Sequence, residues 1–188
     1  LGSLSYTPID SNELHVAGGI LQRPVPLVPC KTIPLAVPGD AEIVIECVIR
    51  PNERRAEAPF GEFPGTYGPE RMNPVLEIKA ITHRKNPLYQ NAFVGHPDSL
   101  LLSGVIRSTA IEETVKMACG TVTGVHMPRS GRFRFSCYIA IDRKIEGEAK
   151  AAAMAAFVTD PFLKFAIVVD HDVDITSDTE VMHATPPV

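Results

Sequence analysis

Residues 41–50 read AEIVIECVIR, and this run decides the fold class. Apolar residues recur at every second position, which is the pattern of a β-strand. One face of the expected strand carries Ile43, Ile45, Cys47 and Ile49. Val44 and Val48 make the other face partly apolar as well. The pattern therefore predicts a strand in which Cys47 is buried and unreactive and neither Cys47 nor Glu46 is a ligand.

Outward from this strand, short elements alternate along the chain. Further strands are expected at 25–37 (one or two edge strands between prolines), 74–82, 89–94, 121–126, 132–141 and 164–169. Helices are expected at 11–22, 98–117, 146–158 and 177–183. The 17 prolines argue against a bundle of long helices. Because strands come in consecutive pairs with helices between them, we predict an α+β fold with a mainly antiparallel, barrel-like sheet.

A long segment rich in proline and glycine, 51–73, is expected to be a loop. Loops of this length inside a domain are usually functional or disordered. Glu57 and Glu62, five residues apart, could face a common centre, and hard cations prefer such oxygen ligands. The alternative is a surface loop whose glutamates are simply solvated.

Composition excludes several function classes. The net charge of −4 and the small size of the basic clusters argue against a nucleic-acid-binding surface. No apolar run is long enough to cross a bilayer, and no signal peptide is visible. The four cysteines are scattered without a C-x-x-C pair, which argues against zinc and favours a reduced, cytoplasmic setting.

Few other residues indicate chemistry by their spacing. Asp170, Asp172 and Asp174 alternate after an apolar run, so they form either a metal site or the cap of the following turn. The six histidines lack a metal-ligand spacing and are interpreted as structural or solvent-facing. The motifs of serine hydrolases, P-loop proteins and Rossmann folds are absent from the sequence.

Several segments resemble the UbiD family of prenylated-flavin-dependent decarboxylases, in the same order along the chain. Residues 37–46, VPGDAEIVIE, are similar to the family's VPADAEIVLEG strand, and 57–67, EAPFGEFPGTY, to its EGPFGEFTGYY loop. Residues 80–89, AITHRKNPLY, resemble AITHRKDPIY, and 164–174, KFAIVVDHDVD, resemble KFVIVVDDDVD. A weaker similarity links 13–20 to the family's AGALRGEP helix. The resemblance covers roughly residues 12–182.

The resemblance implies a split β-barrel of the flavin-reductase type with flanking helices. Residues 1–24 would form a helical lead-in and 25–188 the central domain, with the family's N-terminal and C-terminal regions absent. Glu57 falls where the family places a metal ligand that, with an Asn and a His, holds manganese against the phosphate of prenylated FMN; potassium is left open as a second metal. Asp98 and Glu112 lie nearest to the family's catalytic acids, although neither aligns cleanly, and both could instead be an N-cap and a solvated charge. The aspartates near Asp170 are implied to be structural.

The function implied is that of a lyase which decarboxylates an aromatic or α,β-unsaturated carboxylic acid, as a homo-oligomer of the full-length enzyme. The isolated chain is expected to be inactive, because the metal-binding Asn and His and the catalytic Arg have no counterpart in it. Two alternatives remain open: a non-catalytic subunit, and a flavin-binding or flavin-reductase module.

Overall fold

The structure, a computed structural model, describes residues 12–185 of the chain. These residues divide into two units. Unit 1 comprises 12–60 and 68–91, and unit 2 comprises 61–67 and 92–185. The division expected from the sequence, with a lead-in at 1–24 and one domain from 25 to 188, stays a prediction about the complete protein. The two units described here cut across it.

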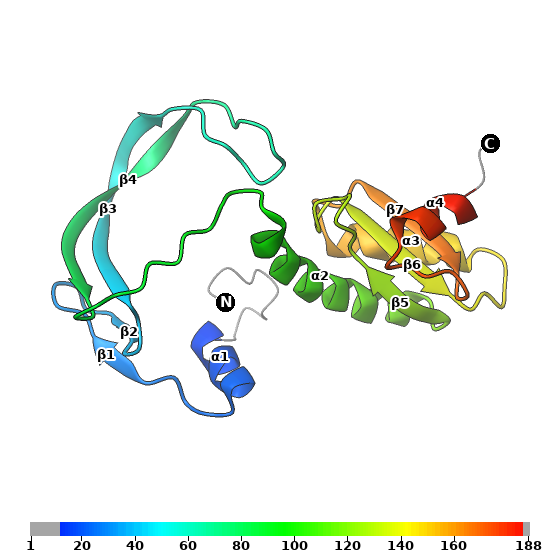
Figure 1. Ribbon diagram of the computed structural model, residues 1–188, viewed down its shortest axis with the longest axis horizontal. Coiled ribbons are helices and arrows are strands. Elements are labelled where there is room, and N and C mark those ends of the chain that lie inside the picture. The colour runs from blue at the N-terminus through cyan, green and yellow to red at the C-terminus, as the bar shows by residue number, and fades with distance from the viewer. Residues whose placement is uncertain (1–11, 186–188) are drawn as a thin grey trace. The chain divides into compact units, whose positions relative to one another are not determined.

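Unit 1 consists of one helix and two antiparallel strand pairs (Figure 1). Its elements are α1 (Glu13–Leu21), β1 (Leu27–Pro29), β2 (Ala36–Pro38), β3 (Ile43–Glu57) and β4 (Arg71–His83). The side chain of Asn12 caps α1 by accepting a hydrogen bond from the backbone N–H of Leu14 at 2.9 Å. Ser11, the first residue of the expected helix, lies outside the described residues. β1 pairs with β2, and β3 pairs with β4.

The β3–β4 pair corrects two sequence-based predictions. β3 continues to Glu57 and β4 begins at Arg71, so the loop between them spans only 58–70 rather than 51–73. The strand expected at 89–94 is absent. Pro51 is tolerated because it lies in an irregularity of the ladder between Ile49 and Arg54, where no paired N–H is required.

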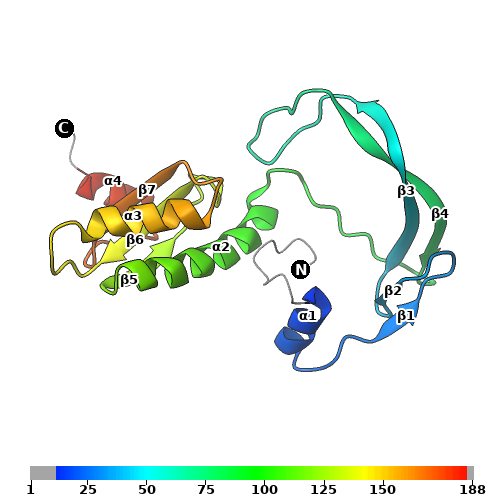
Figure 2. The same ribbon diagram turned by 180° about the vertical axis from the view of Figure 1, so that it is seen from behind.

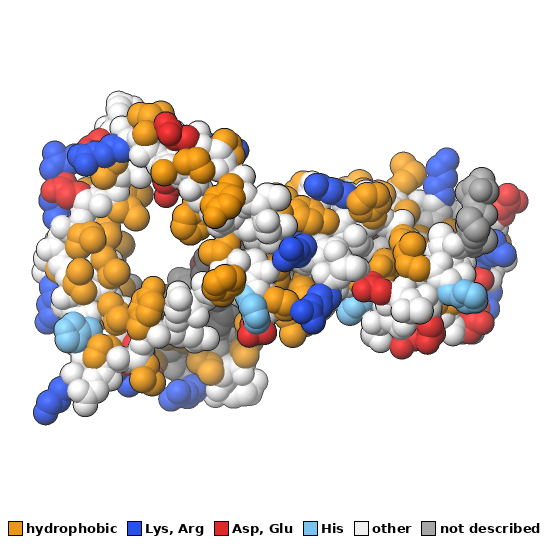
Figure 3. All heavy atoms as spheres, turned by 45° about the horizontal axis from the view of Figure 1, so that its top comes forward, with side chains coloured by type: hydrophobic (Ala, Val, Ile, Leu, Met, Phe, Trp, Pro, Cys, Tyr) orange, Lys and Arg blue, Asp and Glu red, His pale blue; other side chains and the backbone are white. Residues whose placement is uncertain are grey.

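Much of the β3–β4 ribbon exposes apolar side chains (Figure 3). The exposed apolar residues of the two strands are Ile45, Val48, Ile49, Met72, Leu76, Ile78 and Ile81. Among the described residues these strands pair only with each other and close no barrel. The α+β class is therefore confirmed, with antiparallel strand pairs, whereas the split barrel stays a proposal.

A buried carboxylate joins the start of this ribbon to the segment between β1 and β2. Glu46 is only 2% exposed. It accepts hydrogen bonds from the backbone N–H groups of Lys31, at 2.7 Å, and Thr32, at 2.6 Å, and from the Thr32 hydroxyl at 2.5 Å. These bonds, led by that of the Thr32 hydroxyl, lower the pKa of the Glu46 carboxyl despite its burial. Glu46 is thus a structural anchor of unit 1, in agreement with the prediction that it is not a ligand.

Replacing Glu46 by Gln is expected to lower the melting temperature of the chain at pH 7. The NH₂ group of the glutamine amide would face the N–H groups of Lys31 and Thr32 or the Thr32 hydroxyl, which need an acceptor. A carboxyl with a lowered folded-state pKa stabilises the fold above its unfolded pKa, about 4.5, and loses this effect as the pH falls through the folded value. The difference between wild type and variant should therefore shrink when melting is followed below pH 4.5. The exposed Glu70→Gln serves as the control; an equal melting temperature for all three proteins at pH 7 would show that the anchor is not needed.

Unit 2 is a three-stranded sheet with helices on both faces (Figures 1 and 2). Its elements are α2 (Pro97–Ala118), β5 (Val122–His126), β6 (Ser136–Ile141), α3 (Glu148–Thr159), β7 (Phe165–Asp170) and α4 (Asp178–Ala184). The strand order is β5-β6-β7, with β5 antiparallel and β7 parallel to β6. α3 makes the crossover between the parallel strands. α2 and α3 cover one face of the sheet, and α4 lies on the other (Figures 1 and 2).

The core of unit 2 lies between the sheet and the two long helices. It is built from apolar side chains of α2, α3, β5 and β6, among them Ile111, Val115, Cys137, Ile139, Ile141, Ala152 and Ala156. The predicted strand at 132–141 begins only at Ser136, because Arg132 and Phe133 both adopt left-handed backbone conformations, with φ of 57° and 54°. Phe133 is buried against Gly104 of α2, where a Cβ would come within 2.7 Å of the Cβ of Phe133. The turn before β6 is thereby packed closely onto α2.

Thiol labelling under native conditions is expected to separate the four cysteines, all of which are free. Cys137 is fully buried, and burial raises the pKa of its thiol to about 12, so it should react slowest. Cys47, predicted from the sequence to be buried, is only half-buried, because a register shift after Glu46 breaks the alternation and Ile45 and Ile49 are exposed. We therefore expect a thiol reagent to modify Cys47 well before Cys137, as followed by peptide mass spectrometry; equal rates would contradict both placements.

Candidate functional site

Glu57, the expected metal ligand, is the last residue of β3 and lies opposite Arg71 of β4. Its side chain is exposed, and its Oε2 accepts a hydrogen bond from the side-chain amide of Asn73. The sequence places Glu57 in a loop, whereas the structure places it on the rigid end of a strand, where a neighbouring amide orients the carboxylate. Among the described residues, no three His, Cys, Asp or Glu side chains lie close enough to hold a metal ion together. Glu57 is therefore suited to supply one anionic ligand to a hard cation whose other ligands lie elsewhere.

Glu62, the second carboxylate of the loop, belongs to a tip, 61–67, that packs within unit 2. The tip closes on itself through a bridge between Gly61 and Tyr67. The ring of Phe63 stacks on Phe135 with centroids 5.5 Å apart, and the guanidinium of Arg134 lies 4.8 Å from the Phe63 centroid. Glu62 itself is exposed. Because Phe63 holds the tip, Glu62 is not needed to fix it, and Glu57 and Glu62 fall in different units.

Asp98 and Glu112, the two candidate acids, lie on the same helix but far apart. Asp98 stands in the first turn of α2, and its side chain is 88% exposed. Glu112 pairs with Lys116 one turn further along, at 2.5 Å. Fourteen residues of helix separate the two carboxylates by about 21 Å, so they cannot act on one reacting atom.

His96, which sequence reasoning set aside as structural or solvent-facing, lies beside Asp98. Its Nδ1 is 3.3 Å from a carboxylate oxygen of Asp98, and it accepts a hydrogen bond from the Asp98 backbone N–H at 3.4 Å. A histidine and a carboxylate within hydrogen-bond reach can share and transfer a proton. The pattern G-H-P-D before a helix is the only signal in the sequence that could have pointed to this pair: Pro at the first helical position fixes the helix start and brings the residue before it onto the first turn.

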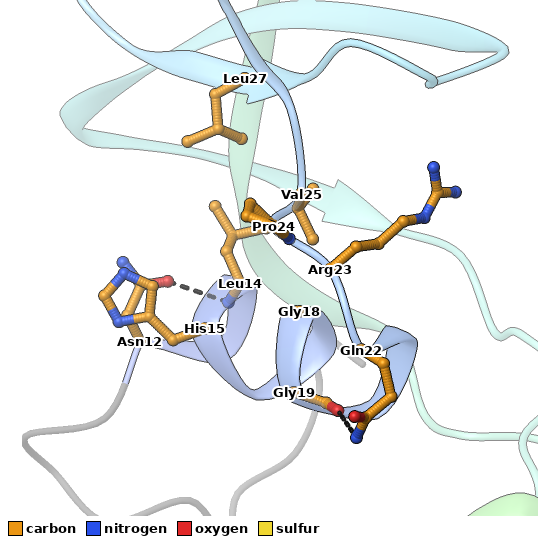
Figure 4. Close-up of a pocket in the computed structure, with 10 residues that line it drawn as sticks. All are labelled: Asn12, Leu14, His15, Gly18, Gly19, Gln22, Arg23, Pro24, Val25 and Leu27. Carbon is orange, nitrogen blue, oxygen red and sulfur yellow. Dashed lines mark hydrogen bonds between the residues drawn. The ribbon is translucent and has the colours of Figure 1, made fainter.

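Alongside α1 lies a cavity of about 650 Å³ (Figure 4). Its wall is largely apolar and includes Leu14, Pro24, Val25 and Leu27, while polar side chains lie at its two ends: Asn12 and His15 at one, Gln22 and Arg23 at the other. A second cavity of about 560 Å³, lined by Ala17, Leu21 and Pro38 among others, borders the same helix. Arg23 is the one arginine that lines both cavities, and Glu13 and Asp40 line the second. Because the rest of their walls is largely apolar, these cavities suit apolar surface better than a phosphate.

Asp174, the last of the three alternating aspartates, serves the local backbone. Asp174 accepts hydrogen bonds from the backbone N–H and the hydroxyl of Thr176, at 2.8 and 2.7 Å, and these bonds lower the pKa of its carboxyl. Asp174 therefore caps the turn that leads into α4, which is the structural role expected for this aspartate.

Two family models match the chain. The one described as the Rift-related domain of 3-octaprenyl-4-hydroxybenzoate carboxy-lyase (UbiD) matches residues 1–97, and the C-terminal domain of the same family matches residues 100–185. The second match lies entirely within unit 2, and it differs from the expectation that the family's C-terminal region is absent.

Solved structures and curated proteins agree with these matches. The UbiD-class enzyme HmfF of Pelotomaculum thermopropionicum, solved with FMN, is 41% identical with a TM-score of 0.90 over 94% of this chain and 40% of its own. An evolved dimeric form of HmfF was solved with prFMN. The 3,4-dihydroxybenzoic acid decarboxylase AroY of Klebsiella pneumoniae is 33% identical, with a TM-score of 0.84 over 94% of this chain and 39% of its own.

Among curated proteins, the anhydromevalonate phosphate decarboxylase of Methanothermobacter thermautotrophicus is 30% identical over 98% of this chain and 43% of its own length. The chain thus spans about two fifths of the length of the relatives that it matches.

Proposed function

The chain belongs to the UbiD family, and on that premise we propose that it is part of a decarboxylase that removes carbon dioxide non-oxidatively from an aromatic or α,β-unsaturated acid. The observation that carries this proposal is the pair of family matches, which together cover nearly the whole chain. Related proteins named as decarboxylases support it.

We propose prenylated FMN and manganese as the cofactors of the complete protein, with potassium as an open option; the flavin complexes of HmfF support the first. When bound, such a flavin supplies an electron sink for the carbon–carbon bond that breaks. Glu57 fits the metal because its carboxylate is exposed, anionic and oriented by the Asn73 amide. A carboxylate oxygen between protein and a hard cation is a favourable ligand for an ion that also binds phosphate.

For the proton that replaces carbon dioxide on the product, we propose Asp98 as the donor, with His96 beside it. Asp98 is exposed at the start of a helix, so substrate can reach its carboxyl. His96 can pass a proton to that carboxyl from solvent. Glu112 is the weaker of the two predicted acids, because its carboxylate is engaged by Lys116.

Several properties of the complete protein extend this proposal. The dimeric form of HmfF supports a homo-oligomer. A cytoplasmic, reducing location accords with four free cysteines. None of the helices in the described range 12–185 is long and apolar enough to span a membrane.

The proposal is tested on the complete protein, expressed with the enzyme that prenylates FMN and supplied with manganese. We expect carbon dioxide release from at least one aromatic or α,β-unsaturated acid, and none from the 188-residue chain alone. Asp98→Asn should abolish exchange of deuterium from solvent into the product while leaving flavin bound. A complete protein that binds flavin but releases no carbon dioxide across a panel of such acids would instead favour the non-catalytic subunit or flavin-binding module.

A further inference from the structure

A small cavity of about 320 Å³ in unit 2 is lined by two arginines. Its walls are the segment that enters α2, the first turns of that helix and the turn before β6, namely Gly95, Pro97, Leu100, Arg129, Arg132 and Phe133. Small-molecule sites usually begin at about 300 Å³, so this cavity can hold a compact ligand or one end of a larger one. The residues that line it include no carboxylate.

The turn that carries the two arginines is held rigidly. Gly131 is buried, and a Cβ there would lie 2.5 Å from the side chain of Ser136. Arg132 and Phe133 hold left-handed conformations that side chains rarely adopt, and Phe133 is wedged against Gly104. Such conformations persist only where the surroundings enforce them.

The guanidinium of Arg132 is fixed in the same way. Its Nη1 donates to the backbone carbonyl of Gly95 at 3.2 Å, and its Nη2 lies against Gly65, where a Cβ would come within 2.7 Å. An arginine held like this is preorganised, so little entropy is lost when its remaining N–H groups bind an acceptor.

The positive charge of this cavity is not neutralised locally. No carboxylate of the described residues forms an ion pair with Arg129 or Arg132. Asp178 accepts hydrogen bonds from Ser130 and Tyr138, each at 2.8 Å. The backbone N–H groups at the start of α2 are also occupied, since those of Asp98 and Ser99 donate to His96. The two guanidinium groups therefore supply the attraction, rather than the helix terminus.

We propose that this cavity, which we call the arginine cavity, binds the phosphate group of a small phosphorylated molecule. The two guanidinium groups together match the charge of a phosphate monoester, which is close to −2 at pH 7. A ligand with a single carboxylate carries a charge of only −1 and would leave one guanidinium group without a counter-charge. Guanidinium also matches the geometry of phosphate oxygens through paired hydrogen bonds. All of the residues that line the cavity belong to unit 2, and phosphate binding to it does not depend on the decarboxylase proposal.

Inorganic phosphate is the probe, and the 188-residue chain is titrated with it at constant ionic strength by calorimetry and by ³¹P NMR line broadening. Arg129→Gln is the decisive variant, because the Arg129 side chain forms no hydrogen bond with any residue that the structure describes, so its loss should not disturb the fold. We expect each of Arg129→Gln and Arg132→Gln to weaken phosphate binding at least about 10-fold. Arg143→Gln, which removes an exposed arginine elsewhere in unit 2, is the matched control and should bind like wild type.

Unchanged binding in Arg129→Gln and Arg132→Gln, or no binding by wild type, would overturn the proposal. So would malonate binding as tightly as phosphate, because the site would then be one for carboxylates. Two further titrations identify the source of the phosphate within the proposal. If FMN displaces phosphate from the wild-type chain and riboflavin does not, the site binds the phosphate of the flavin. If FMN leaves phosphate binding unchanged, the site binds a different phosphorylated molecule.

Discussion

In the complete protein, Glu57→Gln is expected to weaken retention of manganese and flavin by about 10- to 100-fold while leaving the fold intact. The amide is neutral, so a cation held at this position would lose an anionic ligand. Glu57 is exposed at the end of β3, so neither the core nor the ladder depends on its charge. The measurements are manganese by elemental analysis, flavin by absorbance and the melting temperature of the purified variant.

Glu62→Gln is the matched control, since it makes the same change five residues along in the loop tip of unit 2. It should keep both cofactors at wild-type levels. If Glu62→Gln loses them and Glu57→Gln does not, the wrong glutamate has been assigned. If both variants keep them, neither glutamate holds the metal.

A comparably large effect, on stability, is expected from Asp160→Ala. Asp160 is 1% exposed and accepts a hydrogen bond from Arg107, which is 6% exposed, at 2.5 Å. Removing one partner leaves the other charge buried, which typically costs about 3–5 kcal/mol. For a unit of this size, that cost corresponds to a melting temperature lower by at least about 12 °C. Thermal and urea denaturation followed by circular dichroism measure it.

Two further variants separate the buried charge from a general effect of substitution. Lys116→Ala breaks the exposed pair with Glu112 on the same helix and should cost less than about 0.5 kcal/mol. Arg107→Met combined with Asp160→Ala removes both charges and should be milder than Asp160→Ala alone. Asp160→Ala that is no more destabilising than Lys116→Ala would show that the pair contributes little.

Most elements of unit 2 could be predicted from the sequence because their signals are local. The alanine-rich run predicted at 146–158 forms α3 at Glu148–Thr159, and the apolar run at 164–169 forms β7 at Phe165–Asp170. In unit 1 the prolines and glycines predict too long a loop: Pro51 predicts the end of a strand, whereas β3 continues past it through an irregular stretch of ladder. Local composition does not reveal which prolines fall where the ladder needs no donor.

The polar contacts inside the units could not be predicted, since each depends on a partner distant in sequence. Glu46 stands in an apolar run, and its partners lie 14 and 15 residues away. Asp160 meets Arg107 across 53 residues. The candidate role of Glu57 could be predicted because Glu57 lies in a recognisable sequence motif. The arginine cavity could not be predicted, because it depends on a turn whose two left-handed residues are neither glycine nor asparagine. The usual sequence signals for such conformations are therefore missing.

The β3–β4 ribbon has a consequence for solubility. Among the described residues each of its strands is hydrogen-bonded along one side only, so the backbone groups of its outer edges can accept a further strand. Apolar strands with open edges are the segments that start aggregation. Arg50, Glu77 and Lys79 place charges on this ribbon, with Glu77 bound to Arg50 at 2.7 Å and to Lys79 at 2.5 Å. Charges so placed oppose uncontrolled strand addition, so substitutions that neutralise these three residues would act on aggregation before they act on the fold.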